Sequence, residues 1–70
     1  MPKYPHIGIR MPMRDEPDGN AYVILGAAAR VMREENIPSE EINRFYKEAT
    51  SGNYEHLRAT VALWITTVED

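Results

Sequence analysis

Few residues of this chain carry side chains of the kind that do chemistry. His6 and His56 are the two histidines, and there is no cysteine. His56 follows Glu55 and comes three residues after Asn53, but no second metal ligand and no nucleophile accompanies it in a recognised spacing. We interpret residues 51–57 as a tight turn between two helices, in which His56 or Glu55 bonds backbone amides at the start of the second helix. The sequence therefore predicts no enzyme, no metal site and no cofactor.

Arginine and tyrosine side chains offer a second kind of chemistry, the binding of an anionic ligand or of a partner. The candidate contacts are Arg10, Arg14, Tyr22, Arg30, Tyr54 and His56. In so short a chain, a pocket for a small anion would form most easily between subunits. An anion at the Gly19–Asn20 helix start, with Arg14 nearby, is a further alternative, although no glycine-rich loop marks a nucleotide site there.

The position of these side chains depends on a central helix predicted over residues 19–33. Asn20 is a suitable N-cap. Apolar residues then recur at helical spacing, at Ala21, Ile24, Leu25, Ala28, Val31 and Met32. Gly26 interrupts this helix at a cost of about 1 kcal/mol relative to alanine. The segment from Gly26 to Ala29 is a surface of small residues that lets another backbone come close.

Two further helices are predicted after the break at residues 36–38. Ser39 is expected to cap the first of them, whose apolar face carries Ile42, Phe45, Tyr46 and Ala49. Gly52 is expected to end it as a left-handed residue, and Asn53 to cap the next helix. The last helix carries one apolar stripe, made of Leu57, Val61, Trp64 and Val68. Trp64 is the expected core anchor, with its indole nitrogen reaching a partner at the edge.

The N-terminal segment alternates as a strand does. Ile7, Ile9, Met11 and Met13 share one face. Pro12 falls on the other face and lacks an N–H, which restricts the segment to an edge strand or an extended arm. Three arrangements are open: an arm against the helices, pairing with a second copy, and pairing with residues 64–68. We favour the first two equally. The predicted fold is all-α, with an extended arm over residues 1–18 and a three-helix domain over residues 19–70.

Composition and charge narrow the class of protein. The 70 residues make one small domain with an ordinary hydrophobic share of 43%. The longest apolar run is far too short to span a membrane, and no signal-peptide pattern begins the chain, so we expect a cytoplasmic protein. Residues 1–33 carry five basic and three acidic side chains, whereas residues 34–70 carry three basic and eight acidic ones. This asymmetry favours protein contacts or self-association over nucleic acid.

Helix, glycine turn and helix also describe a helix-turn-helix DNA-binding motif. A DNA-binding motif needs lysine and arginine side chains that face the phosphates. Because the second half of the chain is acidic, DNA binding is the least favoured of the alternatives. The feature that would favour it is a single face shared by Arg44, Lys47 and Arg58.

Two motifs resemble those of a set of small uncharacterised proteins from phages, plasmids and bacterial genomes. The first comprises Gly19-Asn20-Ala21-Tyr22 and Ile24-Leu25-Gly26, and the second runs from Glu48 to Leu57 and is followed by Trp64. The resemblance covers roughly the last two-thirds of the chain, and the N-terminal arm and the tail after Trp64 depart from it. It implies a phage or mobile-element origin but no chemistry, because the family has no assigned activity.

The sequence thus predicts a non-catalytic binding protein that self-associates. The leading hypothesis is a phage or mobile-element accessory protein that engages or inhibits a bacterial host protein, located in the host cytoplasm. The alternative is an oligomer that binds a small anionic ligand such as a nucleotide.

Overall fold

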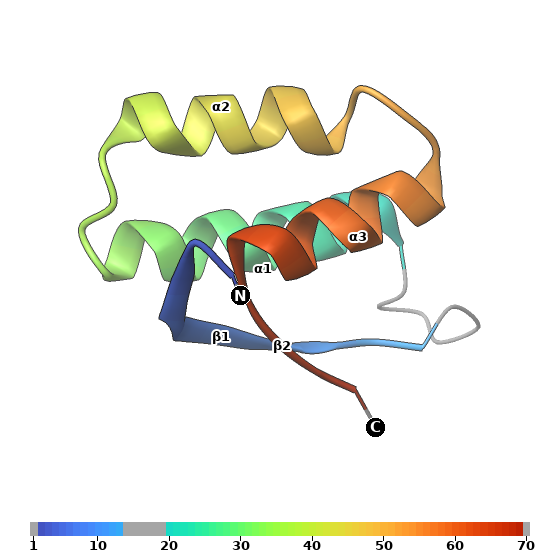
Figure 1. Cartoon of the computed structure of the whole chain (residues 1–70), viewed down its shortest axis with the longest axis horizontal. Helices are drawn as coiled ribbons and strands as arrows, with labels where there is room; N and C mark the ends of the chain where they lie inside the picture. Colours follow the sequence, from blue (N-terminus) through green and yellow to red (C-terminus); the bar gives the residue numbers. More distant parts are fainter. Residues whose placement is uncertain (1, 14–19, 70) are drawn as a thin grey trace.

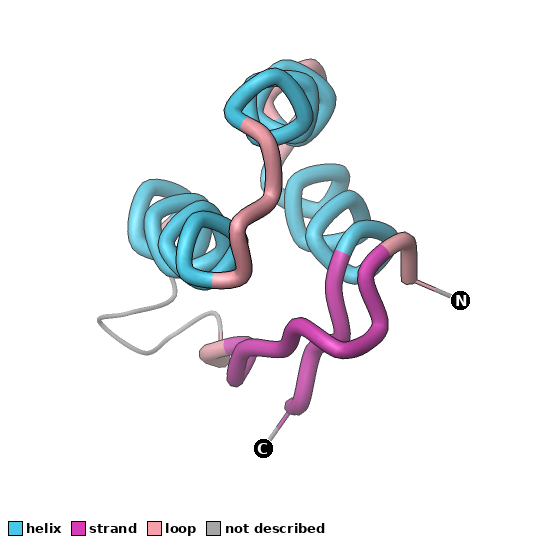
Figure 2. Tube along the Cα trace, turned by 90° about the vertical axis from the view of Figure 1, so that its left-hand side faces the viewer, coloured by secondary structure: helices cyan, strands magenta, loops and turns pink. Residues whose placement is uncertain are grey.

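The structure, a computed structural model, describes residues 2–13 and 20–69. Its elements are β1 (Tyr4–Met11), α1 (Ala21–Glu34), α2 (Ser39–Ala49), α3 (Tyr54–Trp64) and β2 (Ile65–Glu69). α2 lies on one side of α1 and α3, and the two strands lie on the other (Figure 1). Seen along the helices, the three helices form a triangle above the strands (Figure 2).

The two strands pair in parallel to form a two-stranded sheet, so the all-α prediction is wrong. The ladder runs from Gly8 opposite Thr66 to Met11 opposite Glu69, with an irregularity between Tyr4 and Gly8. The chain is therefore a small mixed α/β domain. Of the three arrangements open for the N-terminal strand, the one we did not favour, pairing with the C-terminal segment, is the one present.

The error arose at the end of α3. The stripe from Leu57 to Trp64 continues at helical spacing to Val68, but the helix ends at Trp64. β-branched residues follow, which suit a strand better than a helix, and β1 supplies the hydrogen-bond partners. Ile65 is fully buried as the first residue of β2, whereas Val68 remains 59% exposed.

β1 attaches to the core through alternate residues. Ile7 and Met11 are buried and Ile9 is half-buried, as the strand pattern predicts, whereas Met13 is 52% exposed. Pro12 is buried, although the alternation places it on the face opposite to Ile7, Ile9 and Met11. It follows the last residue of β1, so its missing N–H costs no ladder bond.

The cap predicted for α1 is confirmed. The Asn20 side chain accepts a hydrogen bond from the Tyr22 amide at 2.7 Å. At the other end, Asn36 adopts the left-handed conformation with φ 63°. The amides of Asn36 and Ile37 then bond the carbonyls of Arg33 and Met32, both at 3.0 Å, which closes the helix as a Schellman motif.

Two details of the following helices differ from the predictions. Ser39 is the first residue of α2 and not its cap, because Pro38 occupies that position without a side-chain bond. Gly52 is not left-handed, since no described glycine has a positive φ. The Asn53 cap of α3 is confirmed, with its side chain accepting from the His56 amide at 2.9 Å.

Trp64 is the predicted anchor where the three layers meet. It is 5% exposed, its ring lies 5.7 Å from that of Phe45 and 6.2 Å from that of Tyr4, and its Nε1–H donates to Glu48 Oε2 at 3.3 Å. Both the burial and the edge hydrogen bond agree with the prediction. Within the described residues, no helix has the length and apolar character that crossing a membrane requires.

Candidate functional site

A cleft of about 260 Å³ opens between the start of α1 and the turn that joins α2 to α3. Buried apolar side chains of the three helices contribute to its lining, namely Leu25, Ala49 and Leu57. Tyr22 and Tyr54, two of the predicted contact residues, both line it as well. The fold thus brings together two side chains that lie 32 positions apart in the sequence.

The two tyrosines differ in how firmly they are held. Tyr54 is half-buried, its hydroxyl accepts from Arg58 Nη1 at 3.0 Å, and the Arg58 guanidinium lies 5.6 Å from its ring. Arg58 in turn donates to the Pro12 carbonyl at 2.8 Å, which ties this side of the cleft to the end of β1. Tyr22 is 84% exposed. The cleft therefore has one fixed aromatic wall and one aromatic side chain presented to solvent.

The helix starts beside the cleft are already capped. Asn20 and Asn53 accept from backbone amides in the first turns of α1 and α3. These are the groups that would otherwise bind an anion. Among the residues that the structure describes, no lysine or arginine lines the cleft. Its chemistry suits an apolar or aromatic group better than a phosphate.

Of the predicted arginine contacts, the two that the structure describes do not line this cleft. Arg10 lines a separate groove of about 150 Å³ between β1 and α1. Arg30 projects from α1 and pairs with Glu34 at 3.7 Å, with both side chains more than half exposed. Arg14 lies outside the described residues.

His56 and Ser51 meet in a way that the sequence did not reveal, with Nε2 and Oγ 3.1 Å apart. A histidine beside a serine hydroxyl can act as a general base. Here His56 Nε2 also lies 2.8 Å from the Glu48 carbonyl, which can only accept, so Nε2 carries the hydrogen. Ser51 Oγ donates to the same carbonyl at 2.7 Å. The pair caps the end of α2 and is not arranged as nucleophile and base.

This geometry corrects the predicted role of His56. Its ring bonds a carbonyl at the end of α2, and the amide at the start of α3 is bonded by Asn53 instead. His56 also explains the glycine before it. A Cβ on Gly52 would lie 2.8–2.9 Å from atoms of the His56 side chain. Gly52 is therefore needed for space and not for a left-handed backbone.

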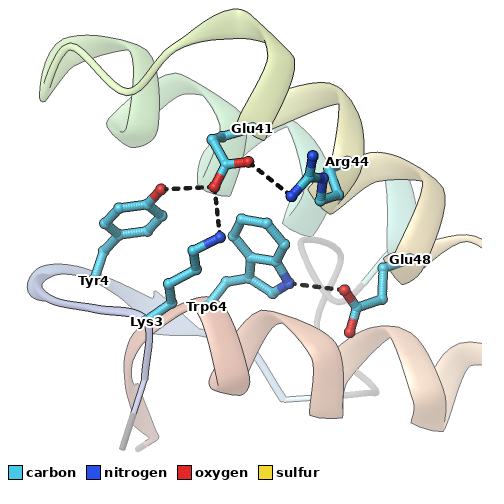
Figure 3. Close-up of polar contacts among 6 residues, drawn as sticks. All are labelled: Lys3, Tyr4, Glu41, Arg44, Glu48 and Trp64. Atoms are coloured by element: carbon cyan, nitrogen blue, oxygen red, sulfur yellow. Dashed lines mark hydrogen bonds and ion pairs between the residues drawn. The ribbon is translucent and has the colours of Figure 1, made fainter.

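A second polar cluster joins the N-terminal segment to α2 and α3 (Figure 3). Lys3 Nζ bonds Glu41 Oε1 and lies 4.4 Å from the centre of the Trp64 ring. Tyr4 donates to the same Glu41 oxygen at 3.2 Å, and Arg44 lies 3.4 Å from the other one. No local pattern could have revealed this cluster, because Lys3 and Glu41 are 38 positions apart.

The cluster shifts the titration of two of its members. The hydrogen bond from Lys3 outweighs the effect of burial and lowers the pKa of Glu41. Burial, and then the bond to the Glu41 carboxylate, raise the pKa of Tyr4. Every polar group at the centre of the cluster is paired within the chain, which is what a structural tether requires.

The helix pair formed by α2 and α3 places Arg44 and Arg58 in different surroundings. Arg58 is directed toward Tyr54 and the end of β1, whereas Arg44 is paired with Glu41 on α2. The two guanidinium groups belong to separate contact networks. In the described part of the chain, no group of three or more His, Cys, Asp or Glu side chains could hold a metal ion.

No protein-family model matches the chain, and neither a curated protein nor a solved structure matches it.

Proposed function

We propose that this chain is a non-catalytic binding protein that engages another protein through the cleft between α1 and the α2–α3 turn. The observation that supports this most directly is that an apolar cleft lies beside Tyr22, an aromatic side chain exposed to solvent. Tyrosine is enriched among the residues that dominate protein–protein binding energies, and such residues pair with pockets on the partner. Tyr22, at 84% exposed, has the character of such an anchor.

The size of the cleft favours a side chain over a cofactor. Pockets for small-molecule ligands usually measure about 300–1,000 Å³, and this one measures about 260 Å³. It can receive one large apolar side chain while Tyr22 packs against the partner surface beside it. An anionic ligand is less well supported, because Arg10 and Arg30 lie elsewhere and no described lysine or arginine lines the cleft.

We further propose, on the resemblance of the two sequence motifs alone, that the partner is a bacterial host protein and the chain a phage or mobile-element accessory protein. This part of the proposal sets where the partner should be sought. It adds nothing to the chemistry of the cleft.

The test is affinity capture from bacterial lysate with a variant that fills the cleft. Thr50 is exposed and lines the cleft, so Thr50→Trp should cover the opening without entering the core. Asn43→Trp places the same bulk on the exposed side of α2, away from the cleft. A protein retained saturably by the wild type and by Asn43→Trp, and lost from Thr50→Trp, supports the proposal. Retention of no protein, or equal retention by both variants, refutes it.

A further inference from the structure

The solvent-facing side of α1 carries exposed apolar side chains. Tyr22 is 84% and Val23 is 44% exposed, and Gly26 and Ala27 follow on the same side. Arg30 is the next residue along this surface, with its side chain 78% exposed. We call these five residues the outer face of α1.

Gly26 marks the centre of the outer face. A Cβ at this position would meet no atom within 4 Å, so nothing in the described chain requires the space that the glycine leaves. Glycine nevertheless weakens a helix interior. At Gly52, by contrast, a Cβ would collide with His56, so the presence of glycine at the two positions has different explanations. The open space at Gly26 suits the close approach of a backbone from outside the chain.

The side chains around Gly26 complement themselves under a twofold rotation. Tyr22 precedes Gly26 by four positions and Arg30 follows it by four, which places each about 6 Å along the helix axis from the glycine. If two copies of α1 cross antiparallel at Gly26, Tyr22 of each copy faces Arg30 of the other. A guanidinium over a tyrosine ring is an attractive pair. The Arg30–Glu34 ion pair is long and exposed, so it offers little resistance to this contact.

We propose that the outer face of α1 is the contact surface of a homodimer, in which two α1 helices cross at Gly26 with Tyr22 of each copy over Arg30 of the other. One helix pair buries less than the roughly 1,200–2,000 Å² typical of stable complexes. The dimer is therefore weak and exchanges rapidly with monomer. A second copy is the occupant whose chemistry matches this face, and it competes for Tyr22 with the partner proposed for the cleft.

The proposal does not depend on the cleft, although Tyr22 stands at the border of both surfaces. Gly26 and Arg30 do not line the cleft, so variants at these two positions test the dimer alone. Thr50→Trp changes no residue of the outer face, but it covers the cleft that Tyr22 also lines, so the variants at Gly26 and Arg30 are the ones that separate the two proposals.

The experiment is sedimentation equilibrium at protein concentrations from about 1 µM to 1 mM, a range that includes the dissociation constants of weak dimers. Gly26→Gln places bulk at the crossing point, and Arg30→Gln removes the cation. Each should raise the dimer dissociation constant by about tenfold or more, as loss of a central contact does. Ala59→Gln on α3 and Lys47→Gln on α2 repeat these changes at exposed positions elsewhere and should leave the constant unchanged.

A second readout separates the loss of a contact from the loss of folding. Gly26→Gln replaces a poor helix former by a good one at a position with open space, so the dilute monomer should unfold at a higher urea concentration while dimerising less. A chain that stays monomeric throughout the range overturns the proposal. A dimer that Gly26→Gln and Arg30→Gln leave unchanged also overturns it.

Discussion

Replacing Gly52 by alanine tests how the α2–α3 turn is held. A Cβ at this position would lie 2.8 Å from His56 Cγ and 2.9 Å from its Cβ and Cδ2, closer than real Cβ contacts. The histidine side chain has to move, and its Nε2–H then loses the Glu48 carbonyl at 2.8 Å. The contacts of the ring with Ser51 and Thr60 are lost with it.

The expected size of the effect follows from these contacts. At about 0.5–1.5 kcal/mol for each hydrogen bond, displacing the ring costs about 2 kcal/mol. The Glu48 carbonyl keeps the Ser51 hydroxyl, which limits the cost. Alanine at a position without a positive φ regains about 0.4–1 kcal/mol by restricting the unfolded chain. We expect Gly52→Ala to destabilise the protein by about 1 kcal/mol, or about 4–8 °C in melting temperature for a domain of this size.

A double-mutant cycle with His56→Ala makes the explanation specific. His56→Ala removes the ring but keeps the Cβ that the new Cβ would approach to 2.9 Å, so Gly52→Ala should destabilise the His56→Ala protein less than it destabilises the wild type. Urea and thermal unfolding followed by circular dichroism measure both effects. If Gly52→Ala stabilised the wild type, the His56 side chain would not be the obstacle. If it destabilised both backgrounds equally, the ring would contribute nothing to the clash.

Three further predictions concern other contacts. Lys3 lowers the pKa of Glu41 below 4.5, its value in the unfolded chain, so the stabilisation of the fold by this ion pair is complete above pH 4.5 and is lost as pH falls through the folded pKa. Glu41→Gln should therefore flatten the decline of the melting temperature at acid pH, and an unchanged decline would argue against the tether. Asn36→Val should destabilise by about 1–2 kcal/mol in urea unfolding because a β-branched residue resists φ 63°, whereas Asn36→Gly should not. Trp64→Phe removes the hydrogen bond to Glu48 and some packing, and should lower the free energy of unfolding by at least about 1 kcal/mol; an unchanged value in urea unfolding would contradict both contributions.

Features fixed by neighbouring residues were predictable from the sequence. Asn20 and Asn53 cap α1 and α3 as expected, because a cap depends only on the residues of its own first turn. Trp64 was predicted as the core anchor because one large aromatic side chain stands in an apolar stripe. The candidate site was predictable only as separate residues. Tyr22 and Tyr54 were both named, but the cleft that joins them depends on how α1 meets the α2–α3 turn.

Features set by distant residues were not predictable. The helical stripe ending at Val68 and the β-branched run from Ile65 support opposite structures, and only the presence of β1 decides between them. The space around Gly52 depends on how closely the His56 side chain approaches it in the folded turn, which spacing does not reveal. The tether between Lys3 and Glu41 is likewise a product of the assembled fold.

The parallel sheet also orders the events of folding. Thr66 and Pro5, which share a hydrogen bond across it, are 61 positions apart. Closing a loop of that length costs about 3–4 kcal/mol of chain entropy before any ladder bond forms. The helices have only short turns to close, so we expect them to assemble first and bring the two ends together. Amide hydrogen exchange should then find the strands opening at lower free energy than the helices, as the last part of the molecule to form and the first to separate.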